Sequence, residues 1–405
     1  MKQGWKIKKL KEICAKITDG THQTPKYFDE GVIFLSSKNV TSGKIDWDNI
    51  KYIDEKQHLE MHKRVAPRVG DILLAKNGTT GVAAMVDRDV VFDIYVSLAH
   101  IRVLEEVTPE FMLYFINSPI AKKQFNKRLK GSGVPNLHLE EIREVEILLP
   151  PLSEQQRIVA ILDEVFEAIA KAKANTEQNL KNAKELFDVY LHKFYTSKEE
   201  GWEEKKLKEV AEYFNGLTYS PKNVSNEGII VLRSSNVQND VLDFKDIVRV
   251  NLNVKEKIIV KEGDILMCSR NGSARLVGKT ATIKNLNEEM TFGTFMMIVR
   301  SQYNPYLSWF FKSTDFRNQI KGGGNTMINQ ITRYMLDDVV ISFPPIEKQN
   351  EVVQKLNALH LEIKKLEAIY QQKINDLEEL KKSVLQKAFA GELKEDLKEH
   401  FAENA

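Results

Sequence analysis

The chain has 405 residues, of which 42% are hydrophobic and 29% charged, and its formal net charge at pH 7 is +2. This length allows two or three domains, and so small a net charge neither requires nor excludes a nucleic-acid partner. We expect neither a membrane span nor a secretory signal, because no apolar run reaches about 18 residues and no basic segment leads into one. Cys14 and Cys268 fall at non-equivalent places in the two halves, which argues against a disulfide and favours a cytoplasmic setting.

Taken in chain order, the two halves of the sequence predict the same series of elements. Each half opens with short apolar runs that alternate with Gly, Asn and Asp turn signals, a pattern typical of strands. These runs lie at 32–35, 71–75, 81–86 and 90–104, and at 229–232, 264–268, 277–283 and 290–300. A helix follows in each half, over 108–129 and 304–320, with a cap residue and then a proline at its start. A glycine-bearing loop, a short strand and a long helix complete each half.

The long helix of the first half starts after two prolines at 150–151 and continues without proline or glycine to about Tyr195. We expect Ser153 to cap this helix and Gln156, three residues later, to complete a capping box. Its apolar residues recur at spacings of three and four over far more than the roughly 8–20 residues usual in globular proteins. A stripe of this length requires a partner helix.

A second helix of the same kind starts after prolines at 344–345 and continues to Gly391. We therefore predict an antiparallel coiled coil formed within the chain, joined to two α+β domains. In that arrangement the start of the chain, at Gly4 and Trp5, lies beside the end of the second helix. The molecule then closes on itself about an approximate two-fold axis.

The halves are copies of one unit, since residues 5–13 recur 197 positions later and residues 31–40 recur at the same shift. A duplication of this period differs from a solenoid of short units. The predicted divisions are a first domain at 1–151, a central helix at 152–197, a second domain at 198–345, a distal helix at 346–391 and a C-terminal tail at 392–405.

Polar loops at matched places in both halves form a candidate binding face. They lie at 20–25, 36–39, 76–80, 234–236 and 269–275. Arg, Lys, Asn, Gln, Ser and Thr dominate them, and these are the residues that read base edges and hold phosphates. A hydrophilic turn explains any single loop equally well, but recurrence in both halves favours a shared binding face.

Other motifs favour structural roles. Glycine loops at 131–133 and 322–325 lack the ending of a phosphate-binding P-loop, so they are either flexible connections or loops that approach a DNA backbone. His58 and His62 could pair as metal ligands on a helix face, but without a second pair or a cysteine cluster we favour solvated surface. We interpret Asp71 and Asp264 as turn residues that start a strand. We therefore expect no catalytic residue and no metal site.

Three repeated motifs carry a resemblance to a known family. They are Trp5 and Leu10 with Trp202 and Leu207, the Gly-Asp-Ile-Leu segments at 70–73 and 263–266, and the helix starts at 149–158 and 343–352. Together they resemble the specificity subunit of type I restriction–modification systems over essentially the whole chain. The second helix start departs from the pattern, with Glu347 in place of the serine and Asn350-Glu351 in place of Gln-Arg.

The resemblance implies an α+β protein with two pseudo-symmetric target-recognition domains separated by two long antiparallel coiled-coil helices. Each domain reads one half of a bipartite, asymmetric site in double-stranded DNA. The helices act as a spacer and as the docking surface for two modification methyltransferase subunits, which carry S-adenosylmethionine. Restriction and translocase subunits that use ATP are possible further partners, and the chain itself catalyses nothing and needs no cofactor.

Within the candidate binding face we select residues for contacts to base edges or phosphates. The primary candidates are Lys76, Asn77, Arg270 and Asn271, and the secondary candidates are Thr21, His22, Gln23, Lys38 and Tyr219. Two alternatives belong to other functional classes: an enzyme that acts alone, which the missing cofactor loop argues against, and a non-catalytic coiled-coil scaffold whose globular ends bind proteins.

Overall fold

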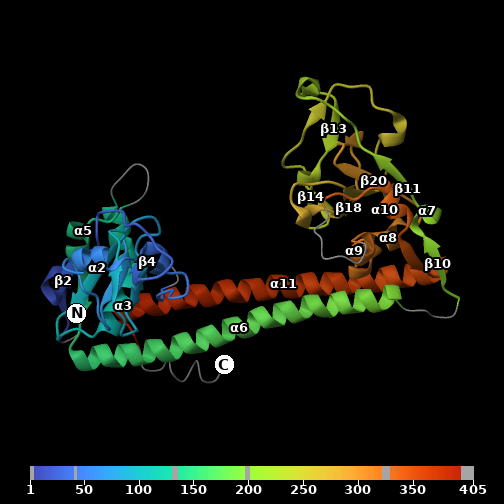
Figure 1. Ribbon diagram of the computed structural model, residues 1–405. Coiled ribbons are helices and arrows are strands. Elements are labelled where there is room, and N and C mark those ends of the chain that lie inside the picture. The colour runs from blue at the N-terminus through green and yellow to red at the C-terminus, as the bar shows by residue number, and fades with distance from the viewer. Residues whose placement is uncertain (1–3, 41–42, 130–135, 197–200, 322–328, 394–405) are drawn as a thin grey trace. The chain divides into compact units, whose positions relative to one another are not determined.

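The computed structural model of the chain describes residues 4–40, 43–129, 136–196, 201–321 and 329–393 (Figure 1). The chain divides into two compact units, Met1–Glu177 with Gln371–Ala405, and Gln178–Tyr370. Each unit holds one α+β domain and part of each of two long helices, α6 (Leu152–Thr196) and α11 (Ile346–Phe389). None of the described helices is both long and apolar enough to cross a membrane. The glycine loops predicted at 131–133 and 322–325 lie outside the described residues.

Two sheets form the first domain. The larger is antiparallel, in the order β2 (Cys14–Asp19), β8 (Leu98–Val103), β5 (Ile72–Ala75) and β6 (Ala83–Met85). The smaller has the order β4 (Lys51–Ile53), β3 (Val32–Leu35) and β7 (Phe92–Ile94), with β3 parallel to β7. Strand β1 (Lys6–Lys9) pairs with β9 (Glu146–Leu149), the strand that precedes α6. The helical segments are α1 (Leu10–Ile13), η1 (Ser37–Val40), α2 (Glu55–Met61), α3 (Pro109–Asn117), α4 (Pro119–Arg128) and α5 (Leu139–Arg143).

The second domain repeats this plan. Its larger sheet has the order β11 (Glu212–Asn215), β20 (Met296–Arg300), β17 (Ile265–Cys268) and β18 (Thr280–Thr282). Its other sheet has the order β12 (Val224–Ser225), β16 (Arg249–Val250), β13 (Ile229–Leu232) and β19 (Met290–Phe292), with β13 parallel to β19. Strands β14 (Val237–Gln238) and β15 (Val241–Leu242) pair, as do β10 (Glu203–Lys206) and β21 (Val340–Phe343). The helical segments are α7 (Leu207–Val210), η2 (Pro221–Asn223), η3 (Ser234–Asn236), η4 (Glu256–Ile258), η5 (Ala274–Leu276), α8 (Asn304–Phe310), α9 (Thr314–Ile320) and α10 (Arg333–Asp337).

Each helix predicted at 108–129 and 304–320 is in fact a pair of helices. Ser118 separates α3 from α4, and Ser313 separates α8 from α9. Both serines are extended, and their side chains accept a hydrogen bond from the backbone of the following helix, at Ala121 and Phe316. A serine that caps a new helix competes with continuation of the previous one, so the prediction of single helices was wrong.

The long helices pair side by side in antiparallel directions within each unit. In the first unit Lys173 on α6 forms an ion pair with Glu378 on α11 at 2.6 Å. In the second unit Lys184 lies 3.6 Å from Glu367, and the Phe187 ring packs 5.6 Å from that of His360. The predicted pairing of the two helices is therefore confirmed in both units.

Each domain packs on the start of one long helix and the end of the other. In the first unit Phe389, at the end of α11, packs its ring 5.1 Å from Phe111, and Trp5 belongs to the same buried cluster. In the second unit Phe194, near the end of α6, packs 5.2 Å from Trp202. The start of the chain thus lies beside the end of α11 inside the first unit, as the sequence predicts.

Gln155 holds the start of α6. The helix begins at Leu152, so Ser153 lies inside its first turn, and the prediction that Ser153 caps the helix was wrong. The buried Gln155 amide donates to the carbonyls of Pro150 (3.0 Å) and Glu106 (2.9 Å), and its oxygen accepts from the Thr108 N–H (2.9 Å). Gln349 donates in the same way to Pro344 at the start of α11 (2.8 Å). A buried glutamine therefore ties each long helix to the segment before it.

Candidate nucleic-acid interface

A glycine begins the loop that follows the first strand of the larger sheet in each domain. A Cβ atom placed on Gly20 would lie 1.9 Å from the carbonyl oxygen of Ile94, and one placed on Gly216 would lie 2.1 Å from that of Gly293. Because the obstructing atoms belong to the backbone, only glycine fits at these positions. Each loop is thereby pressed against the turn that precedes β8 or β20.

Hydrogen bonds fix the first candidate, Thr21, on this turn. Its N–H donates to the carbonyl of Ile94 (3.0 Å), and its own carbonyl accepts from Val96 (2.9 Å). The next candidates, His22 and Gln23, are exposed. In the second domain Leu217 donates to the carbonyl of Phe292 (2.6 Å), and the half-buried candidate Tyr219 follows two residues later.

A buried asparagine holds the second loop of each domain. The Asn39 carboxamide accepts from the Ser36 N–H (2.9 Å) and donates to the carbonyl of Asn49 (3.0 Å). Asn236 repeats these contacts with Arg233 and Asp246 (2.8 and 2.9 Å). The asparagines in these loops therefore shape the backbone and do not face DNA. The exposed residues that they leave at the surface are Lys38 in the first domain and Ser235 in the second.

The third loop follows β5 or β17. Asn77 forms an isolated β-bridge with Asn136, and Arg270 forms the matching bridge with Gln330. Arg270 is exposed, and its guanidinium lies 5.5 Å from the ring centroid of Phe295, a side chain that is itself 58% exposed. An arginine beside an exposed aromatic ring is a common platform for nucleotide stacking.

In both domains the third loop is joined to the second. In the first domain Ser97 accepts from the N–H of Ser37 (3.0 Å) through its hydroxyl and from the N–H of Lys76 (2.9 Å) through its carbonyl. In the second domain the Asn271 amide donates to the hydroxyl of Ser234 (3.2 Å) and its oxygen accepts from the Ser273 N–H (3.0 Å). Asn271 is thus committed largely to holding the loops together.

Lys76 lies in a different setting from the other candidates, because its side chain is buried. Its ammonium forms an ion pair with Asp19 at 3.1 Å, and Arg64 and His22 lie 2.5 and 3.2 Å from the other oxygen of the same carboxylate. Burial by itself raises the pKa of Asp19, but the hydrogen bonds from Arg64, Lys76 and His22 hold that pKa below its ordinary value. Lys76 therefore supports the base of the first loop from inside the domain.

Arg64 is a surface residue that the sequence analysis missed. Its Nη2 atom lies 3.3 Å from the His22 ring, and its Nε–H donates to the carbonyl of Asp19 (3.0 Å). Arg64 follows α2, far from the loop in sequence, so no local motif indicated it. The three candidate loops of the first domain are thus hydrogen-bonded to the turn at 95–97, through Thr21, Ser37 and Lys76, and Arg64 lies beside the first of these loops, at His22.

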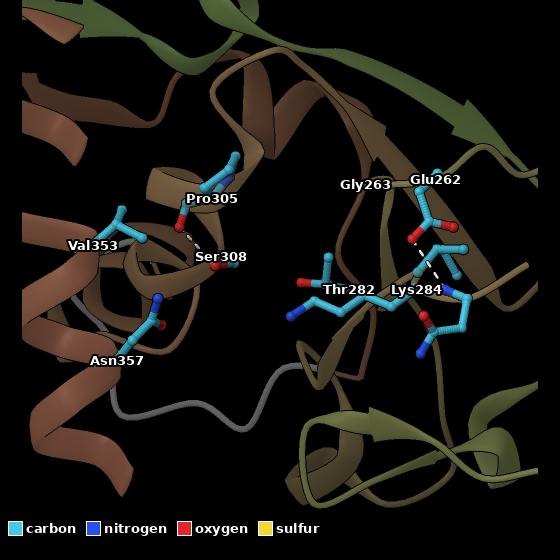
Figure 2. Close-up of a pocket in the computed structure, with 10 residues that line it drawn as sticks. Glu262, Gly263, Thr282, Lys284, Pro305, Ser308, Val353 and Asn357 are labelled. Atoms are coloured by element: carbon cyan, nitrogen blue, oxygen red, sulfur yellow. Dashed lines mark hydrogen bonds between the residues drawn. The ribbon is translucent and has the colours of Figure 1, made fainter. Parts of the chain in front are cut away.

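A cavity of about 340 Å³ lies elsewhere in the second unit, where Val353 and Asn357 on α11 face Lys284 and Glu262 of the domain (Figure 2). The Glu262 carboxylate already accepts from the N–H of Asn285 (3.0 Å). None of the candidate residues lines this cavity, so it is separate from the candidate interface.

The sequence is similar to that of known specificity subunits. It is 23% identical to the type I restriction enzyme EcoKI specificity subunit of Escherichia coli K12 over 417 residues, covering 96% of this chain and 89% of the relative. It is 30% identical to the StySPI specificity subunit of Salmonella potsdam over 203 residues, covering 48% of this chain and 44% of the relative.

Two solved structures share the fold. One belongs to a study of complex assembly and conformational transition of the type I R-M system, with a TM-score of 0.78, 21% identity and coverage of 97% of this chain and 99% of that one. The other is the HsdS subunit of Thermoanaerobacter tengcongensis, with a TM-score of 0.58, 21% identity and coverage of 97% and 98%. The pattern of the family described as "Type I restriction modification DNA specificity domain" matches twice, at residues 2–182 and 199–379. With both halves matched, the chain belongs to the type I restriction–modification DNA specificity family.

Proposed function

We propose that this chain is the sequence-reading subunit of a type I restriction–modification enzyme and that each α+β domain reads one half of a bipartite, asymmetric DNA site. One observation carries the proposal: the two domains share a loop framework and differ in the side chains that it presents. Asn77 in the first domain is matched by Arg270 in the second, and Lys38 is matched by Ser235. A shared framework with different readers suits two related but unequal half-sites.

The candidates contribute unequally to this reading. Arg270 suits a bidentate contact to guanine or a stacking contact. Asn77 is half-buried and its Oδ1 is buried without a hydrogen-bond partner among the described residues, so a contact to an adenine edge requires its side chain to turn outward. Thr21, His22, Gln23 and Lys38 in the first domain and Tyr219 in the second supply further polar contacts, and Arg64 lies beside His22. Lys76 and Asn271 act through the loops that they hold, since their polar atoms are already engaged within the domain.

The two long helices set the separation of the half-sites in this proposal. Linking two readers in one chain raises the effective concentration of the second reader once the first has bound, so modest half-site affinities combine into a tight complex. The same helices present the surface on which two modification methyltransferase subunits dock.

Catalysis and cofactors belong to those partners. The relatives are named as specificity subunits of restriction enzymes, and we propose that S-adenosylmethionine is bound by the methyltransferase subunits and ATP by restriction or translocase subunits. This chain would then need no cofactor of its own. Because its proposed target is DNA, we propose that the complex acts in the cytoplasm.

Reciprocal substitutions test the proposal in the complex assembled with the methyltransferase. Asn77→Ala and Arg270→Ala are compared by gel shift on duplexes in which one or the other half-site is scrambled. We expect each substitution to weaken the recognition of a different half-site, by about 1–3 kcal/mol for a lost base contact. If a substitution instead weakens binding equally on all sequences and reduces the slope of log affinity against log salt concentration by about one, the residue contacts the DNA phosphate backbone. Equal effects of both variants on both half-sites would contradict the assignment of one reader to each half.

A further inference from the structure

Three side chains with metal-binding atoms converge in the first domain, away from the loops described above. His58 Nδ1 lies 2.7 Å from one carboxylate oxygen of Asp93, and His62 Nδ1 lies 3.0 Å from the other. The two imidazole rings are 4.7 Å apart, and the ligand atoms of all three residues lie within 4.8 Å of one another.

The secondary structure places these three groups together. His58 lies on α2 and His62 ends it, four residues apart, so both imidazoles point to the same side of the helix. Asp93 is the middle residue of β7 and is 1% exposed, whereas the side chains of His58 and His62 are 13% and 32% exposed. The sequence indicated only the histidine pair and favoured solvated surface, because the third group comes from a strand more than thirty residues away.

The second domain has a different contact at the position that corresponds to Asp93. There Thr291 occupies the position of Asp93 in the strand, and its hydroxyl donates to the carbonyl of Ile258 in η4 (2.8 Å). One neutral hydroxyl therefore suffices to join the strand to the segment beside it. The first domain instead buries a carboxylate, which is costly unless the charge is compensated.

We propose that His58, His62 and Asp93 form a binding site for a divalent transition metal of the zinc class. Imidazole nitrogen with carboxylate oxygen is a donor set typical of such ions. The ligand atoms, which lie within 4.8 Å of one another, must draw closer to reach ligand distances of about 2.0–2.2 Å from one ion. One metal ion takes the place of the two hydrogen bonds between the imidazole Nδ1 atoms and the carboxylate, and each neutral imidazole then carries its proton on Nε2. Solvent completes the coordination.

A metal at this site would fasten α2 to β7 and, through α2, support the first candidate loop. Gln57 on α2 accepts from the N–H of Lys26 (2.8 Å) and donates to its carbonyl (3.0 Å). Arg64, just beyond α2, binds Asp19 at the base of the same loop. This supporting role rests on the proposed function, whereas metal binding itself does not.

Zinc titration of the full-length chain tests the site. The chain is stripped with a chelator, and Zn²⁺ binding is measured by calorimetry for the unmodified protein, His62→Gln and Asp93→Asn. The matched control is His192→Gln, because His192 also pairs through Nδ1 with a carboxylate, that of Asp315 at 2.8 Å, but without a second histidine. We expect one equivalent of zinc in the unmodified chain and the control, and an affinity lower by on the order of 100-fold in the other two.

Thermal unfolding and the absorption of the cobalt-substituted protein provide two further tests of the metal site. Zinc should raise the Tm of the unmodified chain and of His192→Gln but not that of His62→Gln, whose partly exposed side chain makes misfolding a small risk. Cobalt in place of zinc should give visible absorption without a near-ultraviolet thiolate band, because the site contains no cysteine. An unmodified chain that binds no zinc, equal binding by His62→Gln, or a thiolate band would overturn the assignment. None of these readouts involves DNA.

Discussion

Asp71 and Arg102 form a two-point ion pair at the start of β5, with Nε 2.8 Å from one carboxylate oxygen and Nη2 2.7 Å from the other. Asp264 and Arg300 repeat the arrangement in the second domain at 2.8 and 2.6 Å. Both aspartates are buried. Each aspartate ends a turn and directly precedes its strand, as the sequence predicts, and accepts from the N–H three residues earlier, at Arg68 (2.9 Å) or Lys261 (2.8 Å). The sequence did not indicate that each also anchors the neighbouring strand through an arginine more than thirty residues later in the chain.

Substitution of Asp71 by Asn should destabilise the first domain. Removing one member of a buried ion pair leaves the other charge uncompensated, and because Arg102 keeps some contact with water we expect a loss of about 2–4 kcal/mol. Urea denaturation measures it. Asp89→Asn, at an exposed position, is the control and should change the free energy of unfolding by less than about 0.5 kcal/mol. Equal midpoints for the two variants would contradict a stabilising role for the pair.

The contribution of Asp71 should also depend on pH. Burial raises its pKa, but hydrogen bonds from Arg102 and His100 outweigh burial and hold the pKa well below its ordinary value of 3.8. A carboxylate with a lowered pKa in the folded state contributes stability that is present above its unfolded pKa and lost as the pH falls through the folded value. The difference in unfolding free energy between the unmodified chain and Asp71→Asn should therefore be fully present at about pH 5 and shrink below about pH 4. A difference that grows in acid would show the opposite linkage.

Gln155→Leu should destabilise the first unit, whereas the adjacent substitution Gln156→Leu should not. The leucine removes three hydrogen bonds and leaves the half-buried Thr108 N–H without its partner, at a cost of about 2–4 kcal/mol. Gln156 is exposed, so the same change there serves as a control with the same chemistry. Thermal unfolding compares them. Indistinguishable Tm values would mean that the start of α6 is held by other contacts.

Gly216→Ala should damage recognition of one half-site. The added methyl group meets the backbone at Gly293, so the loop that carries Tyr219 must move, with a strain of about 1–3 kcal/mol. Gly272→Ala is the control in the same domain, since no atom lies within 4 Å of its added Cβ. Half-site binding in the assembled complex provides the measurement. Retention of full affinity by Gly216→Ala would show that the position of this loop is unimportant.

The sequence predicted the repeated architecture but not the breaks between helices or the contacts of the site residues. Duplication and the two long helices were readable because Trp5, Gly70 and the paired prolines recur at nearly constant shifts. The sequence did not predict the helix breaks at Ser118 and Ser313, because serine occurs both inside helices and at their N-caps and only the backbone conformation distinguishes the two. Site residues were the hardest to predict. Lys76 and Arg64 both pair with Asp19, which no local motif connects to either of them, and they differ in exposure: the Lys76 side chain is 7% exposed and that of Arg64 is 46% exposed.

Shortening both long helices should alter the spacing of the half-sites alone. Removal of residues 175–181 from α6 with 370–376 from α11 deletes one heptad from each helix and retains the pairs Lys173–Glu378 and Lys184–Glu367. Seven helical residues span about 10 Å, close to the rise of about 3 base pairs. We expect a preferred gap shorter by about that amount, measured by methylation of a library of spacer lengths. Altered half-site sequences with an unchanged gap would contradict a spacer role.

Methylation mapping shows directly whether the two domains read two different half-sites. DNA from cells that express the chain with its methyltransferase partner is sequenced for modified bases, once with the unmodified chain and once with Arg270→Ala. We expect two unlike sequence elements separated by an unspecified gap of fixed length, with specificity relaxed in only one element by the substitution. A single continuous motif, or a substitution that alters both elements together, would contradict it.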